Sequence, residues 1–445
     1  MESQNEQQEK TGLGNYFIAN YPPFSFWKHD YLPQALETYQ KPPASGTPLG
    51  LYLHIPFCRK RCKFCYFRVY TDKNAKDIEN YTNALVQEVK LLSEQPCVGG
   101  RPLDYVYFGG GTPSYLSASQ LEQLIKQLQE IFPWHHAREV TFECEPGTLQ
   151  QHKLQLLRDL GITRLSLGVE NFKPEILQFN GRAHLEEEIY RAMNWARALN
   201  FPQINLDLIA GMVGEDWDNW KECVRKTIQI GPDSVTIYQM ELPYNTVFSK
   251  ELKMADDPAP SSSKQMGIAD WPTKRAWVDY AFAEFLAAGY SISSAYTVVK
   301  NKSDTSFVYR DALWRGADMF GTGVASFGHM NGVHIQNLDT WESYIDKLNR
   351  HELPLGRAFP TTPRDRLIRE MILQLKTGHL RKEYFLQKYK IDILQEFHIG
   401  FQQLQQLDLL TVNSDSVDLT RTGFLQIDRH LPTFFDPQYR SDRYT

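Results

Sequence analysis

Short apolar stretches alternate along the first half of the chain with longer segments whose apolar residues recur every third or fourth position. A short apolar stretch indicates a buried strand, and the longer period indicates an amphipathic helix. Strands are predicted at 51–55, 105–108, 139–143, 164–168, 204–209 and 234–238. Helices are predicted near 77–92, near 117–132, after 149, near 186–198 and near 217–228.

This alternation predicts an α/β fold in which βαβ units surround a parallel sheet. A closed barrel of this type needs eight units, whereas the pattern supplies six. We therefore predict an open, partial (three-quarter, six-unit) β/α barrel with a smaller, mostly helical C-terminal domain.

Composition and periodicity divide the chain into four predicted parts. The first part is polar and then rich in aromatic residues and proline, and we expect an arm that packs on the barrel without regular structure of its own. The barrel, its extension and a C-terminal helical domain of winged-helix type follow. The four parts are assigned to 1–45, 46–290, 291–350 and 351–445.

Three further segments are predicted in the second half of the chain. Residues 253–273 contain clustered proline, serine and aspartate, which predicts a loop or linker. Helices are predicted near 277–288 and at 364–375. We find no internal repeat.

Charge and hydropathy exclude two classes of partner. The 445 residues are 42% hydrophobic and 23% charged, with a net charge of −5. Such a chain has no broad attraction to nucleic acid or to anionic lipid. There is no apolar run of about 18 residues, which is the length of a membrane span, and the polar start lacks a signal sequence. We expect a cytoplasmic protein with no integral membrane segment.

The most informative motif is a group of three cysteines, Cys58, Cys62 and Cys65, in the spacing C-x3-C-x2-C. In a reducing compartment such a group indicates a metal site before it indicates disulfides. Iron–sulfur clusters usually take four thiolates. A cluster held by three thiolates has one iron without a protein ligand, and this iron can bind a small molecule. The scattered cysteines are expected to be ordinary buried residues: Cys97, Cys144 and Cys223.

Chemistry-bearing residues follow most of the predicted strands, where parallel α/β folds gather their functional groups. The glycine run of Gly109-Gly110-Gly111-Thr112-Pro113 lets backbone approach a ligand, and its amides could bind a carboxylate. Alone, it could equally be a tight turn. Later strand ends carry Glu143, Cys144, Glu145, Glu170, Asn171, Asp207, Ile209, Gln239 and Glu241.

Structural interpretations of these residues stay open. The three cysteines could bind zinc with His54 as fourth ligand, although zinc would not account for the glycine run. His54 could instead be a hydrogen-bonded strand residue. Glu143 and Glu145 share one face of a strand and could form ion pairs with arginine or lysine. The many aromatic residues suit a large planar substrate, but they also suit core packing.

Taken together, the motifs Tyr52-x-His54-Ile-Pro-Phe-Cys58-x3-Cys62-x2-Cys65 and Gly109-Gly-Gly-Thr-Pro113 resemble those of the radical S-adenosylmethionine (SAM) superfamily. Within it, the chain is similar to the branch of oxygen-independent coproporphyrinogen III oxidase. The resemblance covers roughly 48–345 and more weakly the C-terminal domain. Further matching segments lie at 162–172, 180–182, 205–209, 309–328 and 419–424.

The resemblance implies roles for individual residues. The three cysteines would hold a 4Fe–4S cluster whose open iron chelates SAM, with one or two SAM molecules bound. Arg182 would pair with the SAM carboxylate, and Asp207 would hydrogen-bond its ribose. Tyr52 and Glu170 would take the catalytic role and would also contact SAM. The other implied SAM contacts are Gly109, Gly110, Gly111, Thr112, Glu143 and Ile209.

The implied chemistry is one-electron cleavage of SAM to methionine and a 5′-deoxyadenosyl radical, which takes hydrogen from a substrate. By resemblance, this substrate is a tetrapyrrole or another large hydrophobic ring system. The enzyme would need a reductase such as a flavodoxin or a ferredoxin. The protein would bind and orient the reactants while excluding water and oxygen.

Two departures from the family keep three functions open. Tyr66-Phe67-Arg68 stands where the oxidase has Gly-Cys-Asn, and Glu170 stands where the family usually has glutamine. The first hypothesis is an oxidase-like enzyme of porphyrin biosynthesis, and the second is a radical SAM methyltransferase. The third is a heme-binding chaperone, whose His-Asn-x-x-Tyr-Trp element would fall at 307–314 and is missing its His-Asn pair.

Overall fold

The computed structural model describes residues 18–243, 246–254, 267–301 and 305–440. Six strands run parallel in the order of the sequence, as predicted. They are β1 (Leu49–Ile55), β2 (Leu103–Gly110), β3 (Glu139–Cys144), β4 (Arg164–Glu170), β5 (Gln203–Ala210) and β6 (Ser234–Gln239).

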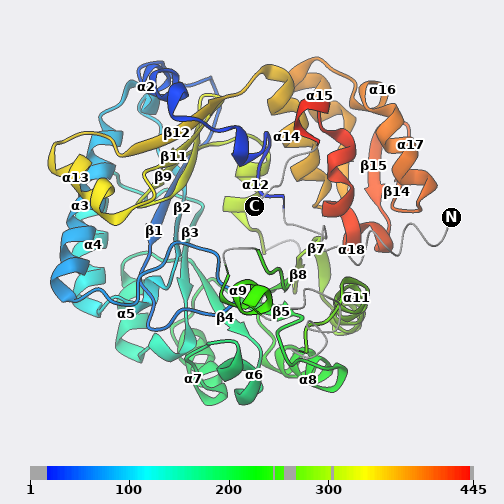
Figure 1. The fold of residues 1–445 in the computed structure, drawn as a ribbon, viewed down its shortest axis with the longest axis horizontal. Helices are drawn as coiled ribbons and strands as arrows, with labels where there is room; N and C mark the ends of the chain where they lie inside the picture. Colours follow the sequence, from blue (N-terminus) through cyan, green and yellow to red (C-terminus); the bar gives the residue numbers. More distant parts are fainter. Residues whose placement is uncertain (1–17, 244–245, 255–266, 302–304, 441–445) are drawn as a thin grey trace.

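Helices follow the first five of these strands and cover the outer side of the sheet (Figure 1). Asn74 and Ser117 each form a capping box with the third residue of the helix that they begin, so the start predicted for the second helix is confirmed. The helices are α3 (Ala75–Ser93), α4 (Ala118–Ile131), α5 (Gln151–Asp159), α6 (Pro174–Phe179), α7 (Glu186–Ala198) and α8 (Trp217–Ile230).

Apolar side chains on the inner faces of these helices seal them onto the strands. In α4, Leu121, Leu124, Ile125 and Leu128 are at most 1% exposed, while the opposite face carries charged residues. Burial of one such side chain contributes roughly 1.5–3 kcal/mol. The helical period visible in the sequence therefore also marks the side that faces the sheet.

Strands from the second half of the chain extend the sheet at both edges. The first extension strand, β9 (Asp318–Thr322), pairs in parallel with β1, and further strands pair in antiparallel. The complete order is β12-β11-β10-β9-β1-β2-β3-β4-β5-β6-β8-β7. The added strands are β7 (Ser291–Ser294), β8 (Thr297–Val299), β10 (Phe327–Met330), β11 (Val333–Asn337) and β12 (Leu355–Pro360).

The predicted N-terminal arm contains regular structure, which corrects the sequence prediction. Its described part includes α2 (Leu32–Tyr39), whose Ala35 and Tyr39 are buried in the main core. Lys28 forms a β-bridge with Ala358 of β12. The sequence prediction missed α2 because a helix of eight residues has too few periods for its pattern to stand out.

Most of the predicted linker at 253–273 lies outside the described residues. Helix α11 (Trp271–Ala287) begins earlier than the predicted residue 277, because Asp270 caps it and Pro272 occupies its first turn. The remaining helices of this region are α9 (Val247–Met254), α12 (Val308–Trp314) and α13 (Trp341–Asn349).

The C-terminal part is mostly helical, as predicted, and also holds a small antiparallel sheet in the order β13-β15-β14. In Figure 1 this part lies at the upper right, and its last helix lies next to β7 and α11. Its elements are α14 (Pro363–Leu375), β13 (His379–Arg381), α15 (Lys382–Tyr389), α16 (Ile393–Glu396), α17 (His398–Gln406), β14 (Leu410–Val412), β15 (Ser416–Leu419) and α18 (Arg421–His430).

One buried carboxylate ties three distant segments to the barrel. Glu88 of α3 is 1% exposed. It accepts hydrogen bonds from the Tyr344 hydroxyl (2.6 Å), the Gly323 amide (2.8 Å) and the Asn337 side chain (2.5 Å). Burial raises the pKa of Glu88 to about 7, although these three donors oppose the rise.

We expect the stability difference between the wild type and Glu88→Gln to depend on pH. A carboxyl group whose pKa is raised in the folded state stabilises most below its unfolded pKa, and this stabilisation is lost as pH rises through the folded value. From pH 5 to 8, the wild type should lose roughly 2–3 kcal/mol relative to the variant.

Urea unfolding at several pH values measures this difference. Glu130→Gln, at an exposed position of α4, serves as the control and should follow the wild type. A pH-independent difference for Glu88→Gln would contradict the assignment.

Candidate functional site

The cysteine loop lies between β1 and α3, at the carboxyl end of the first strand. Two backbone hydrogen bonds fix its course: the Cys58 amide donates to the Tyr70 carbonyl of the same loop (3.0 Å), and the Lys63 amide donates to the Asn180 carbonyl (3.0 Å). The Thr112 hydroxyl lies 3.4 Å from the Cys58 sulfur. The loop is therefore positioned by two other parts of the barrel edge, at Thr112 and Asn180.

All three cysteines are partly buried free thiols. Burial raises the pKa of Cys58 to about 12 and that of Cys65 to about 11. The Arg182 guanidinium lies 3.5 Å from the Cys62 sulfur, where it would stabilise a thiolate. Three soft sulfur ligands with adjacent N–H and O–H donors fit an iron–sulfur cluster. Among the described residues, no three Cys, His, Asp or Glu side chains are grouped as they would be around one metal ion.

His54 is a hydrogen-bonded strand residue, which was one of its two interpretations. Its Nδ1 lies 3.3 Å from the Tyr52 hydroxyl and its Nε2 lies 3.4 Å from the Arg68 carbonyl. Burial lowers the pKa of His54 to about 4, so its ring is neutral at pH 7. Because both ring nitrogens have protein partners, His54 is a poor candidate for a fourth metal ligand.

The glycine run has a role in packing against the cysteine loop, in addition to any role in binding a ligand. Gly110 has φ +114° and faces the His54 ring so closely that an added Cβ would lie 2.5 Å from it. The amides of Gly110, Gly111 and Thr112 donate to Glu143, Ile55 and Phe57, respectively. The expectation that these amides are free for a ligand carboxylate is therefore wrong, because the protein uses all three.

Glu143 and Glu145 have separate partners. Glu143 accepts hydrogen bonds from the Tyr107 hydroxyl (2.7 Å) and the Gly110 amide (3.1 Å), and burial raises its pKa to about 7. Glu145 lies 3.6 Å from Arg59, so the ion-pair interpretation holds for this residue alone.

Arg182 and Glu170 lie together beside the cysteine loop. An Arg182 Nη atom donates to the Gly168 carbonyl (2.6 Å) and lies 3.6 Å from the Glu170 carboxylate. The Arg182 Nε atom is buried and lacks a hydrogen-bond partner in the described part of the chain. Burial raises the pKa of Glu170 to about 7, and Arg182 opposes the rise. The Arg182 guanidinium therefore has an N–H group that can donate a hydrogen bond to a further acceptor.

The backbone at Glu170 adopts an unusual conformation. Its φ is +63°, in the left-handed region that non-glycine residues seldom occupy. The register of β4 against β5 shifts between Gly168 and Glu170. The next residue, Asn171, donates to Glu215 (2.9 Å) and to Asn219 (2.9 Å). This buried network holds the turn that directs Glu170 toward Arg182.

Asp207 is held by a network within the barrel. Its two oxygens accept hydrogen bonds from Ser166 (3.0 Å) and Asn205 (2.8 Å), and Asn205 accepts from Ser234 (2.8 Å). Burial raises the pKa of Asp207. Ile209, two residues further along β5, packs into a small apolar cluster with Met212 and Phe248, among others.

The barrel interior contains an aromatic layer that the sequence motifs missed. The strand register pairs Tyr52 with Tyr107, Tyr107 with Thr141, and Thr141 with Arg164, so these side chains share one face. Tyr309 of α12 packs against Tyr107 with a ring separation of 4.3 Å. This layer could have been found from the sequence, because residues i and i+2 of each predicted strand point to the same side of the sheet.

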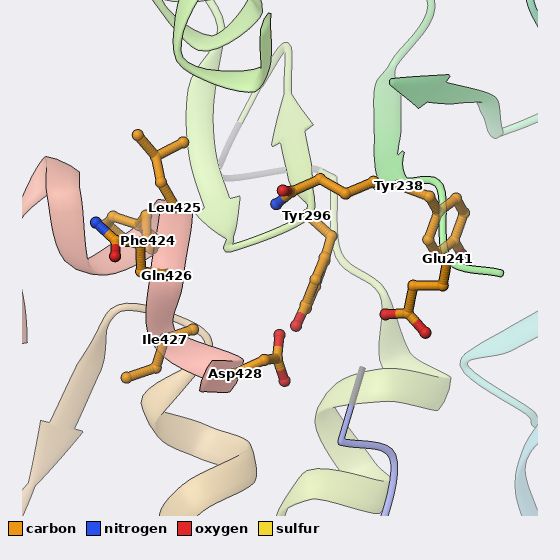
Figure 2. Close-up of a pocket in the computed structure, with 9 residues that line it drawn as sticks. Tyr238, Glu241, Tyr296, Phe424, Leu425, Gln426, Ile427 and Asp428 are labelled. Atoms are coloured by element: carbon orange, nitrogen blue, oxygen red, sulfur yellow. The ribbon is translucent and has the colours of Figure 1, made fainter. Parts of the chain in front are cut away.

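A small pocket adjoins the carboxyl end of β6, where the C-terminal domain meets the barrel. Figure 2 shows the Tyr296 ring reaching toward the Asp428 carboxylate, with the Glu241 carboxylate facing the same space. Asp428 also lies 3.3 Å from buried Lys376. Gln239 and Glu241, two of the predicted strand-end residues, line this pocket rather than the cysteine loop.

Comparisons with known proteins agree with this geometry. The model of the radical SAM superfamily matches residues 52–227. An oxygen-independent coproporphyrinogen III oxidase of Synechocystis is 26% identical, over 96% of this chain and 92% of its own length. The heme chaperone HemW of Bacillus subtilis is 25% identical, over 84% of this chain and 96% of its own length.

The architecture agrees with a solved structure over most of its length. Coproporphyrinogen III oxidase (HemN) from Escherichia coli, a radical SAM enzyme, matches with a TM-score of 0.79 and 25% identity. The match covers 94% of this chain and 96% of that one.

The chain combines an open β/α barrel with a three-cysteine loop after its first strand and a triple glycine after its second. Residues 52–227 thus match the radical SAM superfamily, and most of the chain is similar to oxygen-independent coproporphyrinogen III oxidases and to HemW. In the described residues, no helix is both long enough and apolar enough to cross a membrane.

We expect Asn171→Ala to destabilise the protein by about 2–3 kcal/mol, because it leaves part of the buried Glu215–Asn219 network without donors. SAM should also bind more weakly, because the turn at Glu170 loses its support. Urea unfolding and equilibrium dialysis measure the two effects. Asn194→Ala, at an exposed position of α7, is the control. Equal stability of the two variants would contradict this role.

Proposed function

We propose that the protein is a radical SAM enzyme that modifies a tetrapyrrole-like substrate in the manner of oxygen-independent coproporphyrinogen III oxidase. One observation carries the proposal. The Arg182 guanidinium lies between the Cys62 sulfur and Glu170, with an unfilled buried donor. A carboxylate-pairing group beside a three-thiolate loop is suited to SAM bound at the open iron.

Cys58, Cys62 and Cys65 would hold the 4Fe–4S cluster. When bound, the cluster would supply the electron that breaks a carbon–sulfur bond of SAM. The protein residues provide the other requirements. Arg182 would orient the carboxylate of SAM, and Asp207, already held in place by Ser166 and Asn205, would accept hydrogen bonds from ribose. Glu143 and Glu170 add acidic groups that favour a cationic sulfonium.

A ring-shaped substrate suits the aromatic side chains of the barrel interior and its mouth. Tyr52, Tyr107 and Tyr309 pack face to face or tilted within the barrel. Tyr66 and Phe67, directly after the cysteine loop, are 42% and 49% exposed. These surfaces would bury a flat apolar ligand and exclude water from it. The electron would come from a reductase of the flavodoxin or ferredoxin class.

The second candidate is a heme-binding chaperone, supported by the similarity to HemW over 96% of that protein. Against it, the segment where a His-Asn pair was expected forms helix α12 and its cap, Phe307, without either residue. The methyltransferase hypothesis has no support among the relatives described above.

We expect Cys62→Ala to lose the cluster and SAM cleavage together, because two thiolates cannot retain the iron site. Iron content and 5′-deoxyadenosine are measured after anaerobic reconstitution with SAM and dithionite. Cys97→Ala, which replaces a buried cysteine outside the loop, should keep both. Full iron and full cleavage in Cys62→Ala would refute the proposed site.

The same reactions separate the candidate functions when S-adenosylhomocysteine and heme binding are measured as well. Substrate-dependent 5′-deoxyadenosine without S-adenosylhomocysteine supports the oxidase. Formation of both products supports a methyltransferase. Stoichiometric heme binding without substrate-dependent SAM cleavage supports the chaperone.

A further inference from the structure

A buried arginine inside the barrel has donors that the protein does not use. Arg164, at the start of β4, is 2% exposed, and its guanidinium carbon lies 4.1 Å from the centre of the Phe307 ring. Its Nε and Nη1 atoms have no hydrogen-bond acceptor in the described part of the chain. A guanidinium can only donate hydrogen bonds, and unfilled donors on a buried cation are unfavourable. An acceptor from outside the chain would satisfy them.

The nearby carboxylates do not fill these donors. Glu139 accepts from the amides of Val308 and Tyr309, Glu143 from Tyr107 and Gly110, and Asp207 from Ser166 and Asn205. Burial raises the pKa of Glu143 and of Asp207, and the charge of Arg164 opposes both rises. Arg164 is thus close enough to influence Glu143 and Asp207, but no hydrogen bond joins it to any of the three carboxylates.

A second guanidinium faces the same phenylalanine. Arg310 of α12 is 8% exposed, and its guanidinium carbon lies 5.8 Å from the centre of the Phe307 ring. Asp311 and Ser293 accept some of its N–H groups, whereas the Nη1 atom lacks a partner in the described residues. Phe307 and Tyr309 are only half-buried, so an apolar surface remains accessible beside the two cations.

This position is separate from Arg182. Arg164 precedes Gly168, the residue whose carbonyl contacts Arg182, by four positions on β4. Four residues of strand span about 13 Å. The two arginines therefore lie at different positions along the barrel, and we assign a ligand group at Arg164 to a different carboxylate from one at Arg182.

We propose that Arg164, with the free donor of Arg310, binds a carboxylate of a ligand whose flat apolar body packs on Phe307 and Tyr309. The inference rests on the proposed function for the identity of this ligand, a substrate that carries acidic side chains on a ring system. An amino-acid carboxylate of a second SAM molecule has the same chemistry.

Fluorescence titration of the reconstituted protein tests the substrate source without turnover. The probes are coproporphyrin III, which carries carboxylates, and its tetramethyl ester. Arg164→Gln should weaken binding of the acid at least tenfold, which is about 1.4 kcal/mol, and leave the ester unchanged. Arg138→Gln is the matched control, because this arginine precedes β3 and pairs with Asp104 at the protein surface.

Equilibrium dialysis with labelled SAM tests the other source. Loss of one bound SAM per chain in Arg164→Gln, with unchanged porphyrin affinity, assigns the carboxylate to a second SAM. Wild-type affinity for the acid together with wild-type SAM stoichiometry would overturn the proposal.

Iron content and thermal unfolding check that each variant is intact. If Arg164→Gln does not fold, Arg310→Gln carries the test, with about a fivefold loss of acid binding expected for one hydrogen bond. If the protein binds the acid more tightly than the ester but never cleaves SAM, the proposed function is wrong and the carboxylate site at Arg164 is supported. If the protein cleaves SAM but binds acid and ester equally, and Arg164→Gln binds as much SAM as the wild type, the proposed function is supported and the carboxylate site at Arg164 is wrong.

Discussion

The parallel register of β1 to β6 is the constraint on which the rest of the molecule depends. Because the strands run in one direction, the loops that follow them meet at one edge of the sheet. The cysteine loop, the glycine run, Glu170 and Asp207 are distant in sequence and become neighbours only for this reason. The register also places every second side chain in the barrel interior, where Tyr52, Tyr107 and Arg164 form one layer.

Buried polar groups then set the geometry within this frame. Glu143 accepts from both the Tyr107 hydroxyl and the Gly110 amide, and the hydrogen bond from Asn171 to Glu215 supports the strained turn at Glu170. Such groups are costly to bury without partners, so each network admits few arrangements. This rigidity suits chemistry in which a reactive intermediate must be kept from water and from side reactions.

The six parallel strands, their order and the residues at their ends followed from the sequence, because periodicity reports burial directly. The strands that extend the sheet at both edges did not follow. The cysteines and the glycine run, which the resemblance names together, are neighbours in space, with the Thr112 hydroxyl 3.4 Å from the Cys58 sulfur. The uses of the Gly110 to Thr112 amides did not follow, since they depend on where Glu143 and the cysteine loop lie in space. The layer of Tyr107, Arg164 and Tyr309 was missed for a related reason: α12 enters the barrel from a segment far along the chain. The spacing of apolar residues in the sequence identifies which side chains point into the barrel, but it does not identify the side chains that they contact there.

The bridge between Lys28 and Ala358 has a consequence for the solution behaviour of the protein. An incomplete barrel has two exposed strand edges, and an unpaired edge can recruit strands from other molecules. Lys28 exchanges two backbone hydrogen bonds with Ala358 of the outermost strand β12, and Arg357 of the same strand lies over the Phe24 ring. The arm therefore works as a cover for the edge, and its removal would favour self-association through β12 while leaving the cysteine loop and the barrel interior as they are.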